Sequence, residues 1–308
     1  MSFKGYIKEN LPWIRSIYRK RLAPINLIHN IYDKPVVVLL YHRVNYLNRD
    51  LFNINVTPDN FERHIRILKN HYNVITFNDL KRNDIKEPSV IITFDDGYYD
   101  NYKYAFPILK KYQVPATIFI TSGGVDTGKE FWWDRLETVL FENKNLRESI
   151  ELDILNQRHI FDISDDKKRL HSFYTLHHML FSLHPNERDM MLDRWYESYG
   201  LKVNPNNRTM TSSELIELYQ SQLVTLGAHT IHHPALKQIS REEQIHEIQS
   251  SKLFLENLLH TDIDIFAYPF GHKESFDQVT EQIVQDLGFT YSVSTKRAQI
   301  HSNTIFYT

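Results

Sequence analysis

Seven short apolar segments are the feature that most restricts the fold of this 308-residue sequence. Several, such as Val90–Ile92, are apolar at every position, as strands of a parallel sheet buried on both faces are. The predicted strands are Val36–Leu40, Val74–Thr76, Val90–Phe94, Ala116–Thr121, Leu223–Leu226, Ile265–Tyr268 and Tyr291–Ser294.

Amphipathic helical patterns alternate with these strands. In Pro58–Asn70, the side chains Phe61, Ile65 and Leu68 recur at helical spacing after Thr57, which is suited to cap the helix. Similar patterns span Tyr102–Tyr112, Arg241–Leu259 and Phe276–Leu287. This strand–helix repetition predicts an α/β fold built on a parallel sheet, either a barrel or an open sheet.

Two regions depart from this rhythm. Residues 129–210 are helical and aromatic, with Trp132 and Trp133, and contain no convincing strand of length. We expect them to be a helical insertion, a lid or a substrate wall, that interrupts one domain at 35–308. Residues 1–34 are expected to form a basic amphipathic arm that packs on the domain or contacts anionic lipid.

The composition excludes several classes of function. The 36 Lys and Arg residues balance 38 Asp and Glu residues, which gives no general basis for a nucleic-acid partner. The absence of cysteine excludes disulfides, thiolate zinc sites and thiol catalysis. No signal peptide is recognised, and the longest apolar run, Val36–Tyr41, is far shorter than the ~20 residues of a membrane span. A cytoplasmic location is expected, whereas the oligomeric state cannot be read from the sequence.

Glycine is scarce, and its positions are informative. Those at or just beyond a predicted strand end are Gly97, Gly123, Gly124, Gly227 and Gly271. Glycine allows the backbone angles of tight turns after strands. In parallel α/β folds these carboxyl-terminal strand ends are where active sites form.

The first candidate site follows the strand Val90–Phe94. Adjacent carboxylates at Asp95 and Asp96 point in different directions, so one could bind a cation while the other accepts a proton. The alternative is an ordinary turn in which an aspartate caps the next helix.

The second candidate site is a histidine cluster, His229, His232 and His233, after the strand Leu223–Leu226. Clustered imidazoles suit a divalent transition metal, especially zinc, although solvated loop histidines are the alternative. A catalytic zinc site needs three protein ligands and an open position for water, and Asp96, His229 and His233 would supply the ligands. The pair His229 and His232 competes with His229 and His233.

These motifs resemble the polysaccharide deacetylase family, also known as the NodB-homology domain or carbohydrate esterase family 4. The resemblance is carried by Thr93–Gly97, His229–Pro234 and Ala267–Gly271, together with Tyr41–Val44. The last segment is similar to the permuted branch typified by bacterial poly-N-acetylglucosamine deacetylases, in which the histidine acid lies near the N-terminus. The resemblance implies a distorted (β/α) barrel of seven or eight strands.

The resemblance also implies a metal centre and a reaction. Asp96, His229 and His233 would bind one divalent cation, Zn²⁺ before Co²⁺, Ni²⁺ or Mn²⁺, and Asp95 would be the general base that takes a proton from the attacking water. His42 would protonate the leaving amine of an N-acetylated sugar.

Two further residues complete the implied site. A backbone N–H near Phe270 would stabilise the oxyanion, and Tyr268 is placed with it on the substrate side. The family's arginine at the start of the third motif is replaced by Ala267, so the support of the Asp95 carboxylate is open.

Three functions therefore remain open at this stage. The expected one is metal-dependent N-deacetylation of a glycan or glycan precursor. An O-acetyl glycan esterase would use the same residues, and a non-catalytic glycan-binding protein could retain a vestigial barrel and use the aromatic side chains of the insertion to stack on sugars.

Overall fold

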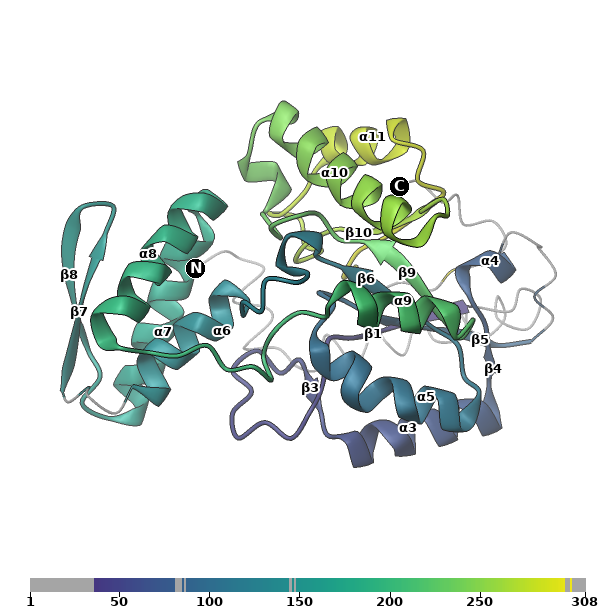
Figure 1. Cartoon of the computed structure of the whole chain (residues 1–308), viewed down its shortest axis with the longest axis horizontal. Coiled ribbons are helices and arrows are strands. Elements are labelled where there is room, and N and C mark those ends of the chain that lie inside the picture. Colours follow the sequence, from purple (N-terminus) through teal and green to yellow (C-terminus); the bar gives the residue numbers. More distant parts are fainter. Residues whose placement is uncertain are drawn as a thin grey trace, which may run out of the picture.

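A curled sheet of parallel strands forms the centre of the molecule. The computed structural model describes residues 36–80, 85, 87–143, 146, 148–296 and 300. The main sheet has the strand order β1-β5-β6-β9-β10-β11, with β4 paired to the start of β5. Every pairing in it is parallel, and the sheet forms a half-barrel surrounded by helices (Figure 1). The predicted barrel-type α/β fold is thereby confirmed.

The strands of the main sheet are β1 Val36–Tyr41, β4 Asn73–Val74, β5 Ser89–Phe94, β6 Ala116–Ile120, β9 Val224–Ala228, β10 Ile265–Ala267 and β11 Tyr291–Val293. The helices around it are α3 Pro58–His71, α4 Phe77–Leu80, α5 Phe106–Tyr112, α9 Ser212–Gln220, α10 Arg241–Leu259 and α11 Gln278–Asp286. A short pair of strands, β2 Arg43–Val44 and β3 Asn55–Val56, follows β1.

Each face of the main sheet packs against its own set of apolar side chains. On one face, Ile92, Ile118 and Leu226 belong to the core that the outer helices cover. On the other face, Ile91 and Phe119 pack in a smaller cluster with residues of β10, β11 and α4. Because neighbouring residues of a strand point to opposite faces, both sets must be apolar. This double burial explains the unbroken apolar runs in the sequence.

All seven predicted strand segments contribute to the main sheet, and the predicted helices are present. The side chain of Thr57 accepts a hydrogen bond from the Asn60 N–H and caps α3, as predicted. The segment predicted as one helix over Tyr102–Tyr112 instead begins with a π-helical turn, Asn101–Ala105, before α5. Pro107 has no N–H to bond the preceding turn and its ring crowds that turn, which a wider turn accommodates.

The insertion has its own hydrophobic core. It contains α6 Trp132–Glu137, α7 Asp166–Phe181 and α8 Pro185–Tyr199, which form a group apart from the main sheet (Figure 1). Buried aromatic and aliphatic side chains of these helices, including Trp132, Trp133 and Trp195, pack together. The tryptophans therefore serve chiefly as core residues of the insertion.

The expectation that the insertion lacks a strand of length is wrong. The strands β7 Ser149–Ile154 and β8 Gln157–Asp162 form an antiparallel hairpin, and β7 alternates exposed and buried residues along its length. Leu155 and Asn156, both with positive φ, form its two-residue turn. The alternation was visible in the sequence, but a Leu-Asn turn lacks the glycine that usually marks such a hairpin.

No helix within the described residues is long and apolar enough to cross a membrane. The predicted basic arm, residues 1–34, lies outside the described residues.

Gly227 is required by the packing across β6 and β9. A Cβ atom at this position would lie 2.6 Å from Cδ1 of Phe119, its partner residue on β6, and 3.0 Å from the carbonyl oxygen of Ile265. We expect Gly227→Ala to lower the free energy of unfolding by about 1–3 kcal/mol through overpacking, measured by urea denaturation. In a Phe119→Leu background, which lacks the phenyl ring, Gly227→Ala should lower the free energy of unfolding by less. An equal cost in both backgrounds would contradict the predicted clash.

Candidate metal and catalytic site

The strand register brings the predicted site residues together. Phe94 at the end of β5 pairs with Ile118, so residue 96 is level with Ile120, which pairs with Ala228. Asp96 follows β5 and His229 follows β9, which places them at one edge of the sheet across β6. The Thr121 N–H donates to the Asp96 carbonyl, and the His229 N–H donates to the Ile120 carbonyl, which fixes both turns to β6.

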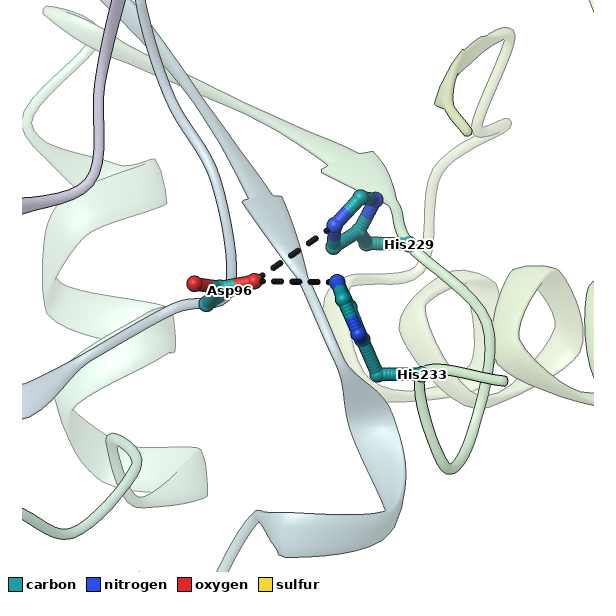
Figure 2. Close-up of side chains that lie close together, drawn as sticks. All are labelled: Asp96, His229 and His233. Carbon is teal, nitrogen blue, oxygen red and sulfur yellow. Dashed lines mark ion pairs between the residues drawn. The ribbon is translucent and has the colours of Figure 1, made fainter. Parts of the chain in front are cut away.

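Asp96, His229 and His233 form a compact, buried cluster. Oδ1 of Asp96 lies 3.5 Å from Nε2 of His229 and 3.3 Å from Nε2 of His233. One potential ligand atom from each residue lies within 4.8 Å of the others. Figure 2 shows the carboxylate facing both imidazole rings. The triad selected from the sequence is therefore assembled in space, and His233 rather than His232 is the second histidine.

The donor atoms of this cluster fit a divalent cation. Nδ1 of His229 lies 2.8 Å from the carbonyl oxygen of Ala267, a contact that orients the ring and leaves Nε2 facing Asp96. Position 267, where the family pattern has an arginine, thus supplies a backbone partner to a histidine. Two imidazole nitrogens and one carboxylate oxygen are a common ligand set for zinc.

The charges of the cluster follow from burial and proximity. Burial raises the pKa of Asp96, but the hydrogen bond to His229 and the charge of His233 outweigh it and lower that pKa to about 2. Burial lowers the pKa of His233 to about 3, so this ring is neutral near pH 7 and able to act as a ligand.

Asp95 is buried beside the cluster without a fixed partner. Its Oδ1 has no hydrogen-bond partner among the described residues, and burial raises its pKa. A buried carboxylate oxygen without a partner is costly in a protein interior, and such groups concentrate at functional sites. Its backbone N–H donates to the carbonyl of Tyr41 on β1, which fixes the turn.

The two loops that carry the cluster, and the turn at Phe270, contain residues in an uncommon backbone conformation. Asp96, Thr230, His233 and Phe270 all have φ between 53° and 75° although none is glycine. Such angles cost about 1–3 kcal/mol each and persist only where surrounding contacts hold them. No sequence pattern indicates these backbone conformations.

Two residues that the sequence analysis missed hold the histidine loop. The Thr230 hydroxyl donates to the His229 carbonyl at 2.6 Å and accepts from the His233 N–H at 3.1 Å. Glu247 on α10 accepts hydrogen bonds from the backbone N–H groups of Ile231 and His232, and its carboxylate also contacts Nδ1 of His232. His232 is therefore bound to α10 and lies outside the cluster.

The cluster opens into a cavity of about 250 Å³. His42, Asp95 and the three clustered residues line it on the sheet side, and Trp133 and His177 of the insertion line it as well. The Trp133 ring centroid lies 5.0 Å from that of His233. The insertion therefore forms part of the cavity wall.

A buried charge network positions the loop that carries His42. Nε of Arg43 donates to Asp100 at 2.9 Å, and its guanidinium also contacts Asp134 of the insertion at 3.3 Å. The side-chain amide of Asn101 donates to the His42 carbonyl. No local sequence pattern marks this network, because its members are far apart in the chain.

Phe270 lines the cavity, and its ring centroid lies 4.5 Å from that of His233. Tyr268, which was grouped with it, lies elsewhere. Its ring is buried in the main core, stacked on Phe276 at 4.1 Å, and its hydroxyl contacts Ser292. Tyr268 points with Phe266 into the main core, as strand alternation requires, whereas the positive φ of Phe270 ends that alternation before the cavity.

Comparison with known proteins gives a consistent result. The family model described as polysaccharide deacetylase matches residues 82–145 and 190–292, more than half of the chain. Poly-beta-1,6-N-acetyl-D-glucosamine N-deacetylase of Staphylococcus aureus is 36% identical over 110 residues, which cover 30% of this chain and 38% of the relative. The Bacillus subtilis protein YxkH is 24% identical over 86% of this chain and 66% of its own length. The chain thus spans about two thirds or less of these relatives.

Solved structures share the fold. The deacetylase PplD of Streptococcus pyogenes, solved in complex with acetate, aligns with a TM-score of 0.56 at 20% identity and covers 89% of this chain and 90% of its own. IcaB from Ammonifex degensii aligns with a TM-score of 0.55 at 19% identity over 85% of this chain and 84% of its own.

The contacts of Thr230 predict a specific loss of stability. Thr230→Val keeps the branched side chain but leaves the buried His233 N–H without its acceptor, so the free energy of unfolding should fall by about 1–3 kcal/mol in urea denaturation. Thr225→Val, at a half-buried position of β9 whose hydroxyl bonds no described residue, should change it by less than about 0.5 kcal/mol. Equal effects of the two substitutions would refute this role for the Thr230 hydroxyl.

Proposed function

Because the chain belongs to the polysaccharide deacetylase family, we propose that it is a metal-dependent hydrolase that removes the acetyl group from N-acetylated sugars of a glycan or a glycan precursor. The observation that carries this proposal is the buried Asp96–His229–His233 cluster in one cavity with Asp95, whose Oδ1 has no hydrogen-bond partner in the part of the chain that the structure describes. The Staphylococcus aureus relative, whose name states that it acts on poly-N-acetylglucosamine, supports an amide rather than an ester as the substrate bond.

In this proposal Asp96, His229 and His233 hold a divalent cation, with Zn²⁺ favoured by the two imidazoles and Co²⁺, Ni²⁺ or Mn²⁺ as alternatives. A cation held there would supply Lewis acidity, which polarises an acyl carbonyl and activates water. The cysteine-free chain offers no thiolate ligand to compete with this set.

Asp95 and His42 divide the proton transfers. Asp95 accepts a proton from the water that attacks the acetamide carbonyl, a role supported by its buried, free Oδ1. His42, on the same cavity, donates a proton to the sugar nitrogen as the C–N bond breaks. The products are acetate and a free amine. The backbone N–H of Phe270, which bonds no described residue, would stabilise the oxyanion.

Metal binding tests the cluster directly. Asp96→Asn and His233→Ala should each lower the zinc bound per purified chain by at least tenfold in elemental analysis after dialysis, because each removes one of three ligands. His232→Ala is the matched control: its ring faces Glu247, so zinc content should not change. Unchanged zinc in both ligand variants would exclude this site.

Acetate release tests the reaction. The chain should release acetate from N-acetylglucosamine oligomers when zinc is present and stop when a chelator is added. Asp95→Asn should lower the rate by about 10²–10⁴-fold, the usual contribution of a general base, while zinc content stays the same. The surface substitution Asp286→Asn should leave the rate unchanged. Faster release from O-acetylated than from N-acetylated oligomers would replace the amidase proposal with the esterase alternative.

A further inference from the structure

His177 is a polar group of the cavity that the proposed reaction does not use. It lies on α7 of the insertion, in residues 146–189, which the family model leaves unmatched. Its ring nonetheless lines the same cavity as the Asp96–His229–His233 cluster.

The ring of His177 is held in place by aromatic neighbours. It stacks on Trp132 with the ring centroids 4.7 Å apart and an angle of 29° between the planes, and it contacts Phe52 at 5.0 Å. The stacked Trp132 covers one face of the imidazole, and the nitrogen atoms lie at the ring edge. A ring clamped in this way needs little ordering when a ligand binds.

The nitrogen atoms of His177 are available to a ligand. Neither forms a hydrogen bond or an ion pair with a described residue, although the side chain is half-buried. Burial, with the nearby charge of Arg188, lowers the pKa of His177 to about 4. Near pH 7 the ring is therefore neutral and presents one donor and one acceptor, the pair that a sugar hydroxyl group complements.

Apolar side chains line the cavity around His177, so its nitrogen atoms can orient a ligand there. Phe52, Ile54, Trp133 and Phe270 give this cavity apolar sides. His272, another polar residue of the lining, already contacts Glu274 at 3.2 Å. Ligand cavities of this kind rely on a few well-placed polar groups within apolar walls to orient the ligand.

We propose that His177 is a substrate-binding residue, whose ring nitrogens hydrogen-bond a hydroxyl group of the sugar that carries the acetyl group. This inference rests on the proposed function and adds that the insertion, as well as the barrel, selects the substrate. The contact is made to the sugar and not to the acetyl group, so His177 contributes to binding and takes no part in the proton transfers.

The test compares His177→Phe with His178→Phe in the zinc-loaded chain. The first keeps the aromatic stack and removes both nitrogens, whereas the second alters an exposed neighbour on the same helix. For acetate release from N-acetylglucosamine oligomers, His177→Phe should raise KM about three- to tenfold with little change in kcat, as expected for one lost hydrogen bond. The kcat/KM for a small aryl acetate, which has no sugar hydroxyls, should not change. His178→Phe should match the parent on both substrates.

A binding measurement separates this inference from the proposed function. The dissociation constant of the oligomer is measured by calorimetry in the Asp95→Asn background, where His177→Phe should weaken binding about three- to tenfold and His177→Gln, which restores a donor and an acceptor, should recover part of the loss. Binding that is unaffected by His177→Phe, or no oligomer binding at all, would overturn the role of His177. Equal losses on oligomer and aryl acetate would show a structural role instead. Intact, His177-dependent binding without acetate release by the parent chain would overturn the proposed function alone.

Discussion

The parallel pairing of β6 with both β5 and β9 is the constraint on which the rest of the structure depends. It sets Asp96 and His229 at one level of the sheet although they are far apart in the sequence, with Ile120 between them. A shift of either strand by one residue would turn its apolar side chains to the wrong face and carry the ligand away from its partner. The apolar packing on the two faces of the sheet therefore also maintains the spacing of the Asp96–His229–His233 cluster.

The cluster concentrates backbone strain where side chains are fixed most firmly. Four non-glycine residues around the cavity have positive φ. In the histidine loop, the Thr230 hydroxyl bonds the His229 carbonyl and the His233 N–H, and Glu247 accepts from the N–H groups of Ile231 and His232. Strain of this kind is stable only when the surroundings leave no relaxed alternative. The buried α10 carboxylate is thus as much a determinant of the loop as the loop's own sequence.

The sequence was sufficient for the sheet, the main helices and the assembled triad, because each depends on short patterns: apolar runs, helical spacing and polar residues directly after strands. It was not sufficient where long-range packing decides the outcome. The β7–β8 hairpin alternates as a strand should, but its turn lacks the usual glycine. Tyr268 was predicted to face the substrate with Phe270 because the two residues are close in sequence. Strand alternation instead directs its side chain into the main core with Phe266. The partners of Arg43 and the cavity position of His177 have no local signature.

The guanidinium of Arg43 joins the sheet to the insertion, since it contacts Asp100 beside the sheet and Asp134 in the insertion. If the insertion opened by itself, Asp134 would lose both its contact with Arg43 and the hydrogen bond that it accepts from the Tyr98 hydroxyl, and the loss of these buried polar contacts is unfavourable. These contacts disfavour unfolding of the insertion alone. The sheet and the insertion are therefore expected to unfold as one cooperative unit. The cavity wall is then as long-lived as the sheet, so its shape is preset before any ligand arrives.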